Sequence, residues 1–118
     1  MKVYVATKWE ERDYAQAVMQ RLIALGHTIS YDWTVVEQIS QTQADLDMAG
    51  VVSADALLFL AEKDLSYKGA LAELGAALAT KKRVILLGHG ADNCIFTHHS
   101  GVERVATLKD AIVALNKP

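Results

Sequence analysis

The sequence predicts an α/β protein built on a parallel sheet, and three observations support this fold class. Apolar runs of strand length alternate with segments whose apolar residues recur at helical spacing. The run 56–61 is uncharged and apolar throughout, as expected of a parallel strand that is covered on both faces. The length of 118 residues, with 52% hydrophobic and 22% charged residues, indicates one globular domain over residues 1–118.

The N-terminal elements follow from local signals. Lys2–Ala6 is a short β-type run, and Thr7 with Glu10 has the form of a capping box in front of a helix. Gly26 is a natural C-terminal stop for that helix. Residues 27–33 alternate enough to predict a second strand near an edge of the sheet.

The rest of the chain continues the alternation of strands and helices. A loop is expected at 34–42, which could cover a binding site, and a helix at 43–53. The buried strand 56–61 is followed by a helix carrying Leu71, Leu74 and Leu78 and by a strand at Arg83–Leu87. A fifth strand is expected within 94–96 or 101–105, and a last helix is capped by Thr107. Four or five strands in this length fit a flavodoxin-like, doubly wound sheet with strand order 2-1-3-4-5 and helices on both faces, which makes three layers.

This strand order places a binding crevice between the first and third strands, because ligands of such sheets bind beyond the carboxyl ends of the strands at the switch point. Residues 7–9 would then lie beside 62–69, and Glu73 would belong to the helix that starts there. Glu73 is the only charged residue of an alanine-rich segment that ends before Lys81. Spacing alone favours an exposed glutamate on a helix surface; a functional carboxylate in the crevice is the alternative.

Charge and cysteine content restrict the partners and the compartment. A net charge of −2 and a pI near 6.0 argue against a nucleic-acid or anionic-membrane surface. No apolar run has the length that a bilayer requires, and the first residues lack the core of a signal peptide. The single Cys94 cannot form an internal disulfide. We therefore expect a cytoplasmic protein with a small-molecule partner.

The sequence predicts neither a metal site nor an organic cofactor. His98 and His99 are adjacent, with no further ligand spacing around them. The turn Gly88-His89-Gly90 lacks the lysine and the length of a P-loop, and the turn after the first strand has no glycine of a dinucleotide fingerprint.

Three carboxylates lie near the expected switch point: Asp47, Asp64 and Glu73. Asp55 precedes the third strand and is therefore expected to be structural. Paired carboxylates in a cleft can divide the nucleophile and acid roles between them, which is the pattern of glycosidic-bond cleavage.

The spacing of these residues resembles the nucleoside 2-deoxyribosyltransferase family, whose superfamily also contains 2′-deoxynucleoside 5′-monophosphate N-hydrolases. Asp47 and Asp55 keep the D-x7-D spacing of the family, and Gly69 and Glu73 keep its glycine-to-glutamate spacing. The run 82–87 matches K-x-V-I-x-L. The resemblance extends over 2–87 in layout and is most specific between Asp47 and Leu87.

The resemblance implies that Glu73 is the nucleophile and attacks the anomeric carbon of a (deoxy)ribose in a nucleoside or nucleotide. Water or a second base would then release the glycosyl-enzyme, without metal or cofactor. Asp64 would handle the sugar or the departing base, and Asp47 would hold or protonate the base. It also implies a homodimer or a higher homo-oligomer in which neighbouring subunits complete the site.

Further residues are expected to bind the substrate, with Tyr4 and Trp9 stacking on the base. The full set is Tyr4, Thr7, Lys8, Trp9, Ser66 and Gly69. The family usually has a glycine-containing turn after the first strand, where this chain has Ala6-Thr7-Lys8-Trp9. This replacement motivates the alternative hypothesis of a non-catalytic nucleoside- or nucleotide-binding module.

Overall fold

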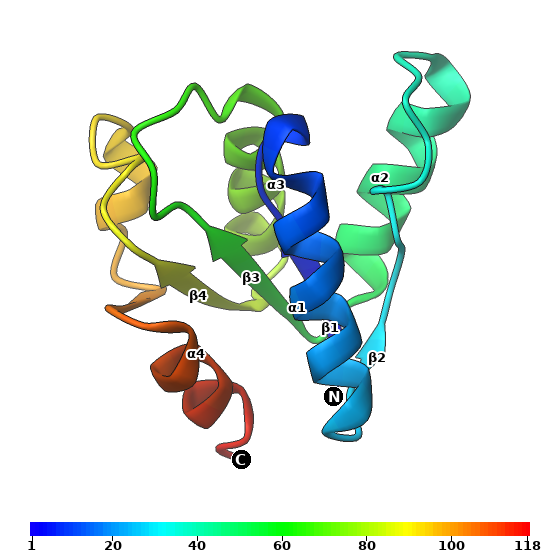
Figure 1. The fold of residues 1–118 in the computed structure, drawn as a ribbon. Helices are drawn as coiled ribbons and strands as arrows, with labels where there is room; N and C mark the ends of the chain where they lie inside the picture. Colours follow the sequence, from blue (N-terminus) through cyan, green and yellow to red (C-terminus); the bar gives the residue numbers. More distant parts are fainter.

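The computed structural model describes residues 1–118 and contains one five-stranded parallel sheet in the order β2-β1-β3-β4-β5. The strands are β1 (Lys2–Ala6), β2 (Thr28–Ile29), β3 (Ala56–Leu60), β4 (Arg83–Leu87) and β5 (Val102–Val105). The helices are α1 (Arg12–Ala24), α2 (Gln41–Ser53), α3 (Lys68–Ala79) and α4 (Leu108–Leu115), with short 3-10 helices η1 (Trp9–Glu11) and η2 (Ile95–His98). Helices α1 and α4 cover one face and α2 and α3 the other (Figure 1). The flavodoxin-like order and the three layers are confirmed.

No helix combines the length and the apolar character that crossing a membrane requires.

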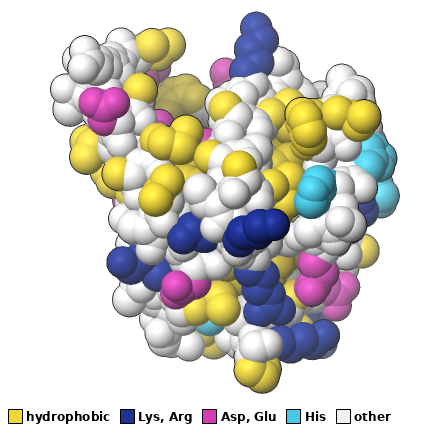
Figure 2. All heavy atoms as spheres, turned by 180° about the vertical axis from the view of Figure 1, so that it is seen from behind, with side chains coloured by type: hydrophobic (Ala, Val, Ile, Leu, Met, Phe, Trp, Pro, Cys, Tyr) yellow, Lys and Arg dark blue, Asp and Glu magenta, His cyan; other side chains and the backbone are white.

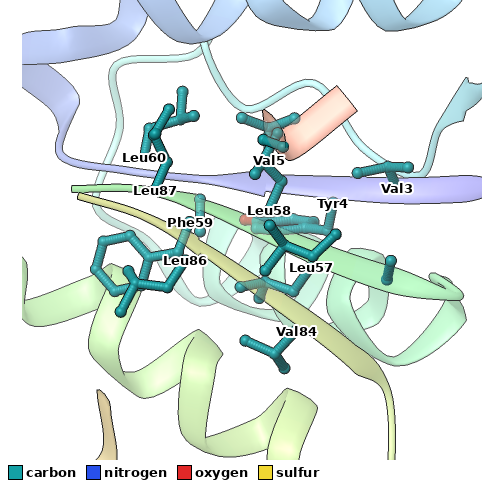
Figure 3. Packing of buried hydrophobic residues seen from close by; sticks show 14 of the residues in the cluster. Val3, Tyr4, Val5, Leu57, Leu58, Phe59, Leu60, Val84, Leu86 and Leu87 are labelled. Atoms are coloured by element: carbon teal, nitrogen blue, oxygen red, sulfur yellow. The ribbon is translucent and has the colours of Figure 1, made fainter. Parts of the chain in front are cut away.

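The core lies around β1, β3 and β4. Every residue of β3 is buried, because parallel strands in the middle of a three-layer fold are covered on both sides. Side chains alternate between the two faces: Tyr4 and Phe59 point towards the layer of α2 and α3, and Val5 and Leu60 point towards α1 (Figure 3). Tyr4 therefore reaches the face on which Glu73 lies.

Two N-terminal predictions were wrong in detail. The Thr7 side chain does not cap a helix; its hydroxyl donates a hydrogen bond to the Leu60 carbonyl at 2.7 Å, and α1 starts only at Arg12. The strand expected over 27–33 is limited to Thr28–Ile29. Asp32 accepts hydrogen bonds from the main chain and the hydroxyl of Thr34, and this local turn leads the chain away from the ladder.

The remaining boundaries follow from caps and pairing. Helix α2 starts two residues earlier than expected because Ser40 caps it, accepting a hydrogen bond from the Gln43 N–H at 3.1 Å. Of the two candidates for a fifth strand, the later one pairs with β4, and residues 95–98 form η2. The Thr107 cap of α4 is confirmed.

The loops that follow β3 and β4 are in close contact. A Cβ at Gly90 would lie 1.8 Å from the Lys63 carbonyl oxygen, and the Gly90 N–H donates to the Ala61 carbonyl at 2.7 Å. Gly88, with φ of +95°, would place a Cβ 2.7 Å from the same Ala61 oxygen. The absence of side chains at these two positions lets the loop after β4 support the loop that carries Asp64.

Candidate active site

The centre of the candidate site is the contact between Tyr4 and Glu73. The Tyr4 side chain is 1% exposed, and its hydroxyl donates a hydrogen bond to a Glu73 carboxylate oxygen. Glu73 lies in the second turn of α3, on the side that faces β1, and is partly buried. The interpretation of Glu73 as a solvated surface glutamate is therefore wrong.

Burial changes the acidity of this pair. Desolvation raises the pKa of Glu73 from 4.5 to about 7; the hydrogen bond from Tyr4 lowers it, and the nearby charge of Asp47 raises it. The pKa of Tyr4 is raised far above its ordinary value, chiefly by burial and then by the negative charge of Glu73. Tyr4 therefore remains a hydrogen-bond donor, while Glu73 changes its charge near neutral pH.

Asp47, on α2, lies near the hydrogen-bonded pair of Tyr4 and Glu73. It is partly buried, and desolvation raises its pKa, although a hydrogen bond from Gln43 opposes the rise. The close approach of α2 depends on Gly50: a Cβ there would lie 2.8 Å from Tyr31 Cβ and 3.0 Å from the Tyr4 ring. The structure thus brings together three of the predicted residues, Tyr4, Asp47 and Glu73.

Gln43 and Tyr31 belong to the same cluster but were not predicted from the sequence. The Gln43 side-chain nitrogen donates to the Tyr31 hydroxyl at 2.7 Å and to Asp47 Oδ1 at 3.1 Å. Gln43 is only 8% exposed. The sequence does place Gln43 four residues before Asp47, a spacing that puts both side chains on one face of the helix.

Thr7 lines a cavity of about 250 Å³ at the carboxyl ends of β1 and β3. Its neighbours make the rim acidic: Tyr14 donates to Glu62 Oε1 at 2.5 Å, and Lys63 pairs with Glu11 at 3.0 Å. The complete lining is Thr7, Glu11, Tyr14, Leu60, Glu62, Lys63 and Tyr67. It lies where the strand order predicts a crevice, but Tyr4, Asp47 and Glu73 do not line it.

Lys8 and Trp9 each contact a neighbouring side chain in the same part of the chain or in the loop after β2. The Lys8 ammonium lies 3.8 Å from Glu10. The Arg12 guanidinium lies 4.7 Å from the centre of the Trp9 ring, and Trp33 packs against Trp9 with ring centres 6.3 Å apart. Trp9 therefore forms part of a packed wall.

Asp64 and Ser66 are not among the groups that hydrogen-bond to Glu73 or shift its pKa. Both are exposed in the loop between β3 and α3, where they line a second cavity of about 350 Å³. Asp64 makes no hydrogen bond to Glu73. Gly69 lies in the first turn of α3, one helical turn before Glu73, and has open space where a side chain would be. The two cavities adjoin through Tyr67, which lines both.

Comparison with solved structures identifies the fold. A CMP N-glycosidase of Clostridium botulinum, BcmB, superimposes with a TM-score of 0.69 at 20% identity, over 98% of each chain. A 2-deoxyribosyltransferase of Bacillus psychrosaccharolyticus gives 0.67 at 20% identity, over 94% of this chain and 90% of that one. A 2-deoxyribosyltransferase of Leishmania mexicana gives 0.58 at 18% identity, over 74% and 63%.

Sequence comparison alone finds neither a matching family model nor a matching curated protein. The resemblance inferred from the spacing of Asp47, Gly69 and Glu73 is thus confirmed through the structure, at the level of the fold. This chain has the fold that the CMP N-glycosidase and the 2-deoxyribosyltransferases share.

Proposed function

We propose that the protein is a cytoplasmic enzyme that cleaves or transfers the N-glycosidic bond of a (deoxy)nucleoside or nucleotide, with Glu73 as nucleophile. The observation that carries this proposal is the partly buried Glu73 carboxylate, which Tyr4 orients and whose pKa burial raises to about 7. A carboxylate held in this way can act as a nucleophile towards an electrophilic carbon. The fold shared with an N-glycosidase and with deoxyribosyltransferases supports the same chemistry.

The reaction would proceed in two displacements. Ionised Glu73 attacks C1′, the bond between C1′ and the base nitrogen breaks, and its electron pair leaves with the base. The departing base takes up a proton from Asp47, whose pKa burial raises above its ordinary value. Water, or the N–H nitrogen of a second base, then attacks C1′ and gives up a proton to Asp47, and the bond between C1′ and Glu73 breaks to restore the carboxylate. Asp64 is the second candidate for the acid and would act from the loop after β3.

The test is base release from a panel of deoxynucleosides and their 5′-monophosphates, followed by chromatography. Glu73→Ala and Glu73→Gln should lose at least about 10³-fold in rate, since covalent catalysis depends on this carboxylate. Glu103→Gln, a change at an exposed residue of the edge strand β5, is the matched control and should retain the rate. Base release that is equal in all four proteins, or absent from all, would overturn the proposal.

A second candidate function, a non-catalytic nucleoside-binding module, is favoured by the wall at Thr7–Trp9. Thr7 donates to a main-chain carbonyl, Lys8 pairs with Glu10, and Trp9 packs between two neighbours. These contacts stand where the family usually has a glycine-containing turn, so a nucleoside could bind without being positioned for reaction. Calorimetric binding of nucleosides without base release would identify this function.

We also propose that the protein forms a homodimer or a higher homo-oligomer through α2 and α3. Leu46, Met48 and Val52 of α2 are each at least 40% exposed, and apolar side chains gather on the face that Figure 2 shows. The small Gly75 and Ala76 would let a second subunit approach α3 closely. Light scattering after size exclusion should report more than 12.9 kDa, and Val52→Lys should shift the mass towards the monomer.

A further inference from the structure

We infer that Arg104 is a positioning residue of the candidate site. It fixes the loop that follows β4, residues 88–101, and through that loop it fixes the loop after β3, whose residues 62–67 line both cavities. The edge strand β5, which carries Arg104, thereby helps to shape a site to which it contributes no lining residue. The consequence for catalysis rests on the proposed function.

Arg104 contacts three separate points of the loop after β4. Its Nη1 donates to the Gly88 carbonyl at 2.6 Å, at the start of the loop, and its Nη2 donates to the Thr97 carbonyl at 3.4 Å. Nη1 also lies 2.7 Å from Asp92 Oδ1, between these two points of the chain. A planar guanidinium has donors that point in several fixed directions, so one side chain can hold separate parts of the loop together.

Asp92 completes the connection within the loop. Its Oδ1 is sealed from solvent and is not aligned for a hydrogen bond, so the attraction between opposite charges holds it against Arg104. Its Oδ2 accepts a hydrogen bond from His89 Nδ1 at 2.8 Å, and its carbonyl oxygen lies 2.8 Å from His98 Nε2. The hydrogen bond from His89 and the charge of Arg104 outweigh desolvation and hold the pKa of Asp92 below its ordinary value. Asp92 is therefore ionised at neutral pH and keeps its attraction to Arg104.

The loop that Arg104 holds is in direct contact with the loop after β3. The Gly90 N–H donates to the Ala61 carbonyl at 2.7 Å, and a Cβ at Gly90 would lie 1.8 Å from the Lys63 carbonyl oxygen. No side chain separates the two backbones at this point. A shift of the loop after β4 would therefore move residues 62–67, and with them the walls of both cavities and Asp64, the second candidate for the acid.

The test measures amide hydrogen exchange in Arg104→Met, a substitution that keeps an unbranched apolar side chain and removes the guanidinium. The loss of charge-assisted hydrogen bonds should let the two loops open more often and raise exchange in residues 61–67 and 88–99 roughly tenfold. Exchange in α1 should stay unchanged. Arg104→Lys keeps the charge opposite Asp92 but not the donor geometry, and it should restore part of the protection.

Arg83→Met is the matched control. Arg83 begins the neighbouring strand β4, and its side chain is 27% exposed, against 23% for Arg104. Its Nη1 also donates to a main-chain carbonyl, that of Lys117, at 2.8 Å. Arg83 lines neither cavity. Its substitution should therefore leave exchange in residues 61–67 and 88–99 unchanged.

Base release measures the consequence for the site. With the deoxynucleoside that the unmodified protein cleaves fastest, Arg104→Met should raise KM about fivefold or more and change kcat less than about twofold. Displaced cavity walls would weaken the binding of the substrate and of the transition state alike, which gives this division between KM and kcat. Arg104→Lys should have an intermediate KM, and Arg83→Met should match the unmodified protein.

The outcomes separate this inference from the proposed function. Unchanged exchange in Arg104→Met, or an equal rise in Arg83→Met, would overturn the bracing of the loops. Faster exchange with an unchanged KM would overturn the role of Arg104 in the site and leave the proposed function intact. If the unmodified protein releases no base, the proposed function fails, and calorimetric binding of the same deoxynucleosides replaces KM. Equal affinity of Arg104→Met and the unmodified protein, or binding to neither, would then overturn the role of Arg104 in the site.

Discussion

Replacing Glu73 with glutamine should stabilise the folded protein at alkaline pH and have little effect in mild acid. Burial raises the pKa of Glu73 from 4.5 to about 7, so the folded state binds the proton more tightly than the unfolded state does. Stability therefore falls as pH rises between these two values. Each pKa unit is worth about 1.4 kcal/mol, so ionised Glu73 costs the folded state about 3 kcal/mol above pH 8.

The measurement is urea unfolding of the two proteins at pH 5 and at pH 8.5. Glutamine is close in shape and can still accept the hydrogen bond from Tyr4, so the substitution mainly removes the charge. At pH 5 the penalty of Glu73 is below about 1 kcal/mol, and the two proteins should differ by no more than that. At pH 8.5 the variant should be more stable by about 3 kcal/mol, or roughly 10 °C in melting temperature.

Glu37→Gln, in an exposed loop, controls for the general effect of removing a negative charge. A Glu73→Gln variant that is equally stable to the parent at pH 8.5, or that gains the same stability at both pH values, would refute the reasoning. It would mean that water or a conformational change solvates the carboxylate.

Three further predictions concern Tyr4, the loop after β4 and the start of α2. Tyr4→Phe removes the hydrogen bond that lowers the pKa of Glu73, so the acidic limb of the kcat/KM profile should move to higher pH, and an unmoved limb would contradict the pairing. Gly90→Ala would place a Cβ 1.8 Å from a carbonyl oxygen in the loop after β3 and should destabilise the fold by about 3 kcal/mol in the same unfolding assay. Ser40→Ala removes the N-cap of α2 and should cost about 1 kcal/mol in the same assay.

The sequence predicted the sheet well because its signals are local and strong. The apolar run of β3 and the helical stripe of α3 each identify their element without reference to the rest of the chain. Strand β2 is shorter than its sequence pattern predicts. The alternation of apolar and polar residues continues past Ile29, but Asp32 stabilises a turn there and the strand ends. Thr7 and Glu10 match a capping box, but a buried Leu60 carbonyl offers Thr7 a partner that only the tertiary structure reveals.

The candidate site was predictable only where the family pattern could guide it. Glu73 and Asp47 follow from spacing, but spacing does not show that Tyr4 turns its hydroxyl towards Glu73. Asp64 has a suitable place in the order of the chain, yet its side chain lies in an exposed loop beside the second cavity. Gln43 has no distinctive context in the sequence, because its importance depends on where Gly50 allows α2 to lie.

The fully buried strand β3 also has a consequence for how the chain reaches this structure. Its backbone must pair with β1, which precedes it by a whole helix pair, and with β4, which is synthesised later. Until both have arrived, an uncharged apolar segment is available for pairing with other chains. Asp55 at one end and the charged residues 62–64 at the other flank this segment, as charges do that oppose intermolecular strand pairing. Refolding should therefore be most efficient in dilute protein, and neutralising the exposed flanking residue Asp64 should increase aggregation during refolding.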